Sequence, residues 1–150
     1  MSVEFNEGTL GKVQLNSGSV ALPFQPKSID EELRACKRYY QVSGGLNDYD
    51  RFPVMAIIAR SDTLAEGLFQ HEIEMRKRPT FAYTGNIGSF SLISGTVNVY
   101  LTAMSTNSAQ SNSKHTNITF TAASGLTDTR PYMLRTNSNI DCTLTLNAEL

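Results

Sequence analysis

Apolar and polar side chains alternate with a period of two along much of this chain, and that alternation constrains the fold more than any other feature. The clearest stretch is residues 140–147, in which Ile, Cys, Leu and Leu alternate with Asp, Thr, Thr and Asn. Residues 97–103, 118–122 and 69–75 follow the same pattern. Because successive side chains of a strand point to opposite faces, each stretch predicts a strand with one buried face.

Weaker signals add further strands to this pattern. Residues 52–59 are nearly all apolar and predict a buried central strand, whereas residues 36–42, 80–84, 90–93 and 132–136 predict shorter strands. Gly, Asn and Ser clusters between these stretches predict turns. We therefore expect an all-β protein of about eight to ten strands, arranged as a sandwich or a barrel.

Two segments depart from the strand pattern. Residues 28–35 predict one short helical turn, in which Ser28 caps the N-terminus and Glu31 completes a capping box. The stretch from Ser105 to Asn117 has no apolar residue larger than Ala. We expect this stretch to be a long exposed loop, which is either functional or mobile.

The composition excludes some classes of partner. The chain has 13 Lys and Arg against 14 Asp and Glu, for a net charge of −1. Because phosphate binding needs a concentrated excess of basic residues, we expect neither a nucleic-acid nor a membrane partner. The chain also has 15 Ser, 15 Thr and 11 Asn, which favours β structure with a neutral exterior. Cys36 and Cys142 could pair, but two small buried apolar residues are the simpler interpretation.

Three phrases of the sequence resemble a known family. They are VQLNSGSVALPFQPKSIDEELRACKRYYQ at Val13–Gln41, MRKRPT at residues 75–80 and LNAEL at Leu146–Leu150. In order and spacing they are similar to the distal β-sandwich domain of bacteriophage tail-fibre, tailspike and other virion surface proteins. The chain departs from the family where it has Gln25 and Asn147 in place of the usual acidic residues, and Lys37 in place of the usual Gln.

The resemblance implies a jelly-roll-like antiparallel β-sandwich. It implies a single domain over residues 13–150, preceded by an N-terminal arm of residues 1–12. Proteins of this family are usually homotrimers on the virion surface, often bound to glycans or host surfaces.

The resemblance also implies a function. We expect a non-enzymatic bacteriophage structural protein, assembled in the cytoplasm of the bacterial host and located on the virion surface. Because only about a dozen residues lie outside the matched region, we expect a trimeric capsid decoration or cement protein, or a short surface fibre. Its partner would be the major capsid protein or another virion protein. The alternative is a tail-fibre-type receptor-binding domain that recognises host surface glycans.

The sequence carries no motif for a catalytic, cofactor or metal site, and we expect none. His71 lies on an alternating face and is interpreted as a satisfied or partly exposed histidine. Residues 47–50 offer oxygen ligands but lack the rest of a calcium-binding loop, so an ordinary turn is the preferred interpretation.

Six residues are predicted to contact a glycan or a partner. Tyrosine rings can stack on the apolar face of a sugar while the hydroxyl stays wet, and basic residues can pair with acidic groups. Alternation would send Arg76 and Arg78 to one face and Lys77 to the other, which argues against one continuous basic surface. The six residues are Tyr49, Tyr83, Tyr132, Arg76, Arg78 and His115.

Overall fold

The computed structural model describes residues 26–49, 51–139 and 141–149. This part of the chain holds one α-helix, α1 (Ile29–Lys37), two short 3-10 turns, η1 (Ile87–Ser89) and η2 (Ser108–Gln110), and nine strands. The strands are β1 (Tyr40–Gly44), β2 (Val54–Ala59), β3 (Leu64–Gln70), β4 (Thr80–Tyr83), β5 (Phe90–Ser94), β6 (Val97–Thr106), β7 (His115–Ala122), β8 (Pro131–Thr136) and β9 (Thr143–Asn147). The prediction of a mostly β chain with one short helix is confirmed.

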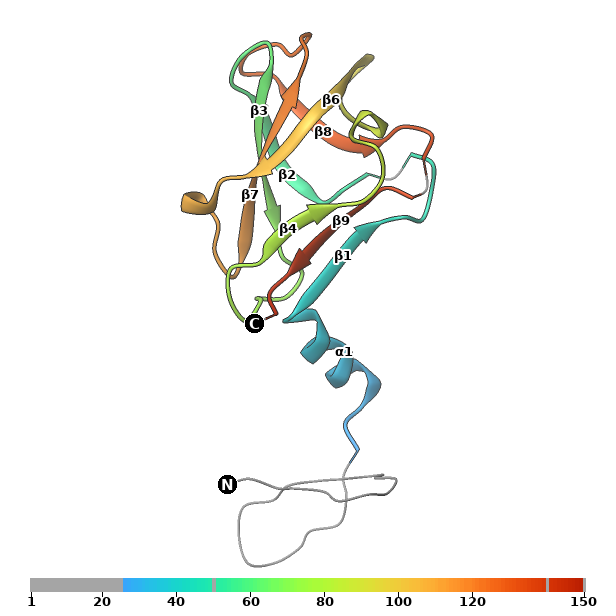
Figure 1. Ribbon diagram of the computed structural model, residues 1–150, viewed down its shortest axis with the longest axis vertical. Helices are drawn as coiled ribbons and strands as arrows, with labels where there is room; N and C mark the ends of the chain where they lie inside the picture. The colour runs from blue at the N-terminus through green and yellow to red at the C-terminus, as the bar shows by residue number, and fades with distance from the viewer. Residues whose placement is uncertain (1–25, 50, 140, 150) are drawn as a thin grey trace, which may run out of the picture.

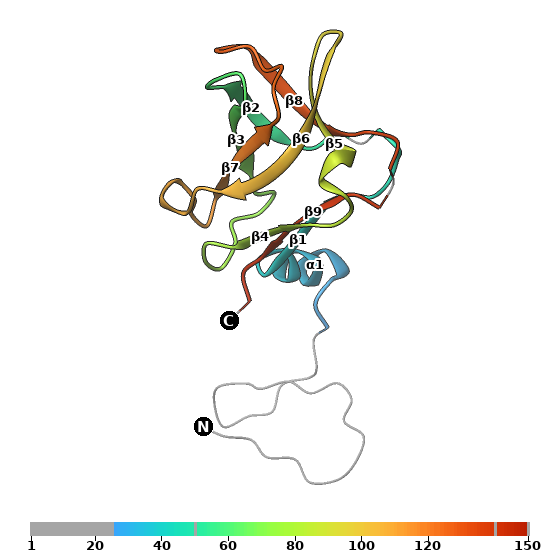
Figure 2. The same cartoon turned by 45° about the horizontal axis from the view of Figure 1, so that its top comes forward.

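The strands form two antiparallel units. Six of them close into a barrel in the order β2-β3-β7-β6-β5-β8, and the other three form a sheet in the order β1-β9-β4. The barrel closes because β8 pairs with β2, with Tyr132 opposite Ile57. Closure removes the free edges of a sheet, so the arrangement is not clearly the jelly-roll sandwich that we expected. In Figures 1 and 2, α1 lies beyond the three-stranded sheet, at the end of the molecule away from the barrel.

One hydrophobic core joins the two units. Phe90 on β5 is fully buried, and its ring lies 5.8 Å from that of Tyr83 on β4 in an edge-to-face arrangement. The Phe90 ring also lies 5.7 Å from that of Phe52. Leu144 and Leu146 on β9 belong to the same buried cluster as Ile118 and the other barrel residues. The sheet therefore packs on the barrel through shared apolar contacts.

Period-two alternation predicted two strands correctly. Cys142, Leu144 and Leu146 are buried along the β9 segment, and the intervening residues are half-buried. β7 alternates without a break from His115 to Ala122. Both strands have one face on the core, which is the condition under which a period of two persists.

The alternation predicted for residues 97–103 is wrong at its end. A register shift between Leu101 and Ala103 interrupts the pairing of β6 with β7. The shift reverses the faces, so that Ala103 is exposed and Met104 is buried. A β-bulge adds one unpaired residue, which is why the simple period fails here.

The strand predicted over residues 69–75 ends early. β3 stops at Gln70, although His71 and Met75 are buried. The backbone N–H groups of His71 and Met75 donate to the carbonyls of Lys114 and Ser113 instead of to a regular strand partner. The residues after Gln70 therefore alternate in burial without forming a strand, in the irregular segment between β3 and β4.

Two other strand predictions need correction. Residues 52–59 are not buried throughout, because Ile58 on β2 is 38% exposed and the outer face of a barrel strand meets solvent. Residues 36–42 are not one strand, because α1 continues to Lys37 and β1 begins at Tyr40. A strand over these residues would turn one of Tyr39 and Tyr40 inward, but both are exposed.

The start of α1 was predicted correctly. The Ser28 hydroxyl accepts from the Glu31 N–H, and the Glu31 carboxylate accepts from the Ser28 N–H, which completes the expected capping box. The predicted arm of residues 1–12 and the first part of the Val13–Gln41 phrase lie outside the described residues.

Candidate interaction surfaces

The basic phrase at residues 76–78 lines an open hollow of the surface. Arg76, Lys77 and Arg78 all border this hollow, together with Ser111–Ser113 on the other side. Thr80, Asn147 and Glu149 complete the lining. The prediction that alternation would separate Lys77 from the two arginines is wrong, because residues 76–78 lie in the irregular segment before β4. The hollow therefore combines three cations with neutral hydrogen-bonding groups and one carboxylate.

Internal hydrogen bonds hold the loop that faces these cations. The Ser111 hydroxyl donates to the Asn107 carbonyl at 2.7 Å, and it accepts from the Asn117 N–H at 3.0 Å. The Asn112 side-chain oxygen accepts from the N–H groups of Lys114 and His115. The stretch predicted as a loop over residues 105–117 is shorter than expected, since β6 continues to Thr106 and β7 begins at His115. Its polar side chains thus organise a compact turn.

The two arginines of the hollow are held in place. The Arg78 guanidinium donates to the Ser108 carbonyl at 2.9 Å. The Arg76 guanidinium lies over the Tyr39 ring, 5.6 Å from its centroid. Among the described residues, neither arginine forms an ion pair with a carboxylate. Both therefore keep donors for an anionic group.

Of the other predicted contact residues, two tyrosines pack inside the molecule. Tyr132 is only 6% exposed, and its hydroxyl accepts from the Thr127 N–H at 2.9 Å. Tyr83 is half-buried between Phe81 and Phe90. Since a sugar needs an open ring face, Tyr132 cannot serve as a stacking platform in this fold.

Tyr49 is exposed and His115 is half-buried. The Tyr49 hydroxyl lies 2.6 Å from the Ser138 hydroxyl, and the Arg135 guanidinium lies 5.4 Å from the Tyr49 ring centroid. The His115 ring lies 3.4 Å from the Asn112 amide, at the edge of the hollow. The structure therefore brings Arg76 and Arg78 to one hollow, which His115 does not line, and places Tyr49 in separate contacts.

His71 is buried and both of its ring nitrogens are hydrogen-bonded. Nδ1 lies 2.8 Å from the Ser113 carbonyl, and Nε2 lies 2.9 Å from the Thr116 hydroxyl. A carbonyl can only accept, so Nδ1 carries the proton and Nε2 accepts from Thr116. The interpretation of His71 as a satisfied histidine is confirmed.

The free energy of unfolding is expected to decrease as the pH is lowered, because His71 is buried in its neutral form. Burial lowers the pKa of His71 below the ordinary 6.5, and nearby His115 adds to this effect, whereas the hydrogen bond to Ser113 opposes it. The unfolded chain therefore takes up the proton first. The stabilisation is complete above the unfolded pKa and is lost as pH falls through the folded pKa. Urea unfolding between about pH 7 and pH 5 should show a steeper loss for the wild type than for His71→Gln. Equal slopes for the two proteins would contradict this assignment.

The helix α1 leaves its apolar side chains uncovered. None of its nine residues is buried, and Ile29 and Leu33 are 85% and 51% exposed. Tyr40 and Val42 on the adjoining β1 are exposed as well. Isolated helices shorter than about 12–15 residues are marginal in water, and a capping box adds only about 1 kcal/mol. This helix therefore lacks the tertiary packing that normally stabilises one of its length.

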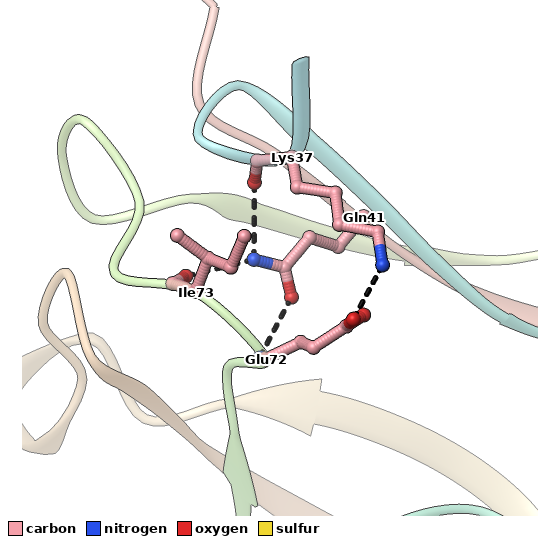
Figure 3. Close-up of polar contacts among 4 residues, drawn as sticks. All are labelled: Lys37, Gln41, Glu72 and Ile73. Atoms are coloured by element: carbon pink, nitrogen blue, oxygen red, sulfur yellow. Dashed lines mark hydrogen bonds and ion pairs between the residues drawn. The ribbon is translucent and has the colours of Figure 1, made fainter. Parts of the chain in front are cut away.

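A polar network fixes the end of α1 to the body of the protein (Figure 3). The buried Gln41 amide donates to the carbonyls of Lys37 and Ile73, at 3.0 and 2.8 Å. Its oxygen accepts from the Glu72 N–H at 3.1 Å, and Lys37 forms an ion pair with the Glu72 carboxylate. The network sets the direction in which α1 leaves β1.

Replacing Gln41 with alanine should test this anchor. The change removes three hydrogen bonds and leaves buried backbone groups without partners, so we expect the free energy of unfolding to fall by about 1–3 kcal/mol. Urea unfolding would measure the loss. Gln70→Ala is the matched control, since Gln70 is exposed at the end of β3 and should lose less than about 0.5 kcal/mol. Equal losses for the two variants would contradict the anchoring role.

An apolar groove continues the exposed face of α1. Leu33 and Cys36 from α1, Tyr40 and Val42 from β1, and Phe69 from β3 line it, along with several polar neighbours. Among the described strands, β1 lies at the edge of its sheet and pairs with β9 alone. We refer to Ile29, Leu33, Cys36, Tyr40 and Val42 as the α1–β1 face. The helical spacing of the apolar residues 29, 33 and 36 is visible in the sequence. It was missed because residues 36–42 were predicted to form a strand, which separated Cys36 from the helix.

The cysteines lie in different surroundings. Cys36 is exposed on α1, whereas Cys142 is buried, and neither forms a disulfide. Burial is the main cause that raises the pKa of the Cys142 thiol, which reduces its reactivity. The two are unpaired, as preferred from the sequence, but only Cys142 is a buried apolar residue.

Within the described ranges, no cluster of three or more His, Cys, Asp or Glu residues could hold a metal ion. No helix in those ranges is long and apolar enough to cross a membrane. Comparison with known proteins found no matching family model, curated protein or solved structure.

Proposed function

We propose that this chain is a non-enzymatic bacteriophage virion surface protein, which assembles as a homotrimer and decorates or cements the capsid or forms a short fibre. The observation that carries the proposal is the uncovered α1–β1 face on an otherwise packed β protein. An apolar face of this kind is characteristic of a surface that another polypeptide covers. The resemblance of the three sequence phrases supports the virion assignment, and a jelly-roll relationship of the strands rests on that resemblance alone.

Labelling of intact particles tests the virion assignment. Antibodies raised against the purified chain would be applied to particles of the phage that encodes it, and imaged with gold. Label over the capsid is the expected result. Particles that bind no antibody, although the same antibody recognises the purified chain, would overturn the assignment.

The basic hollow favours a second candidate function, recognition of a host surface glycan. Its three cations and the Asn112 side-chain amide provide the charge-assisted and neutral donors that an acidic sugar needs. In this role the protein would act at adsorption, and particle labelling would appear at the tail end. The carboxylate of Glu149, which also lines the hollow, would repel the acidic group of the sugar and so direct that group toward the three cations.

A glycan-binding assay tests this second function. Wild-type protein should be retained on acidic host polysaccharide, and an Arg76→Ala, Lys77→Ala, Arg78→Ala triple variant should bind at least about tenfold more weakly, since each charged hydrogen bond contributes about 1.5–3 kcal/mol. Lys114→Ala is the control, because Lys114 is exposed in the same loop but does not line the hollow. Failure of the wild type to bind host cells or their polysaccharide would remove this candidate.

A further inference from the structure

The apolar residues of α1 have the spacing of a coiled-coil seam. Ile29, Leu33 and Cys36 are separated by four and three residues, which places them at successive d, a and d positions of a heptad. Tyr40 follows four residues later at the start of β1. All of these side chains are exposed, so no part of the chain that the structure describes occupies the seam. We propose that a second copy of this chain covers it, with the α1 helices parallel.

The charges that flank the seam are complementary between copies. In this heptad Glu32 occupies a g position and Lys37 the e position five residues later. In a parallel coiled coil, these two positions on neighbouring helices face one another, and charge pairs there select partner and orientation. The e positions of α1 hold Asp30 as well as Lys37, so the complementary pair between neighbouring helices is Glu32 with Lys37. Each copy therefore offers what its neighbour requires, which favours a second copy over an unrelated partner.

The existing contact of Lys37 is compatible with this pairing. Lys37 is bonded to Glu72 of its own chain, but an ammonium group has three donors and can bond to a second carboxylate. The Gln41 network holds the end of α1 in a fixed direction, as Figure 3 shows. The helix is therefore positioned before assembly, with its apolar stripe directed outward.

The groove extends the interface beyond the short helix. Leu33 and Cys36 line the same groove as Tyr40 and Val42, so a neighbouring α1 seated on the seam would also cover part of β1. Because Glu32 of one copy meets Lys37 of the next, the contact is head-to-tail around the axis, and such contacts close into rings when the rotation allows. This inference rests on the self-association in the proposed function. It adds that the α1–β1 face is the interface and that the α1 helices are parallel.

Oxidative cross-linking tests the orientation. The chain has only two cysteines, and Cys142 is buried. Brief oxidation of the native assembly with copper–phenanthroline should join Cys36 to Cys36 and give a covalent dimer on a non-reducing gel. Cys36→Ser should abolish that band, and adding Ile29→Cys to that variant should restore it, because parallel helices place equal positions opposite each other. A band that appears only between Ile29→Cys and Cys36 chains would show antiparallel helices and overturn the proposal.

A matched pair of charge substitutions tests the surface. Leu33→Asp should lower the mass in solution threefold, from trimer to monomer, whereas Ala35→Asp on the opposite side of α1 should leave the trimer intact. Circular dichroism would verify that both variants keep their strands. A trimer that resists Leu33→Asp and shows no Cys36 cross-link would overturn this seam while leaving self-association standing. A monomeric wild type would overturn both.

Discussion

Replacing Phe90 with alanine is expected to lower the free energy of unfolding by about 3–5 kcal/mol. Phe90 is fully buried where the barrel meets the three-stranded sheet, and its ring contacts those of Tyr83 and Phe52. The truncation removes apolar area from the core and leaves a cavity at the junction of two units, which neither unit can close alone. The loss should appear in urea unfolding followed by circular dichroism.

The control for Phe90 is an aromatic residue on the outside of the same barrel. Tyr100 on β6 is 51% exposed and accepts a hydrogen bond from the Asn137 side chain. Tyr100→Ala should lower the free energy of unfolding by less than about 1.5 kcal/mol. Two separate unfolding transitions in the wild type, with Phe90→Ala affecting only one, would contradict a shared core.

The second large effect is expected for Gly44→Ala at the end of β1. Gly44 has a φ of +93°, which side chains other than glycine rarely tolerate. A Cβ there would lie 2.6 Å from Phe52 Cε1 and 2.7 Å from the Cys142 backbone oxygen. Backbone strain of about 1–3 kcal/mol adds to an overpacking cost of about 1–3 kcal/mol. Thermal and urea unfolding should both show a loss of about 2–6 kcal/mol.

Gly95→Ala separates the two contributions. Gly95 also has a positive φ, +62°, but a Cβ there would meet only an Arg130 nitrogen at 3.7 Å, which is ordinary contact. It should therefore show the backbone cost alone, about 1–2 kcal/mol. If Gly44→Ala costs no more than Gly95→Ala, the close packing of β1 against Phe52 and Cys142 is not as described.

Local patterns predicted the strands better than their arrangement. Cys142, Leu144 and Leu146 alternate strictly because one face of β9 lies on the core, so the sequence records their environment directly. Closure of the barrel depends on Tyr132 pairing with Ile57, which are distant in sequence and carry no mark of that partnership. The bulge after Leu101 likewise has no signal in the apolar pattern.

The candidate surfaces were predictable only in part. Arg76 and Arg78 were predicted as contact residues, but the hollow that they line also needs residues 111–113, Asn147 and Glu149, which only the folded chain brings together. Tyr132 was a reasonable contact residue by type, yet folding buries it. The α1 stripe has a helical spacing in the sequence. Its exposure is a property of the whole structure, because any of the strands could have covered it.

The mass of the protein in solution tests the central claim most directly, namely that copies of this chain cover the α1–β1 face of one another. Sedimentation equilibrium on the purified full chain through the micromolar range should give three times the chain mass of 16.5 kDa. A species of 16.5 kDa that remains monomeric at the highest of these concentrations, with its strands intact, would contradict it.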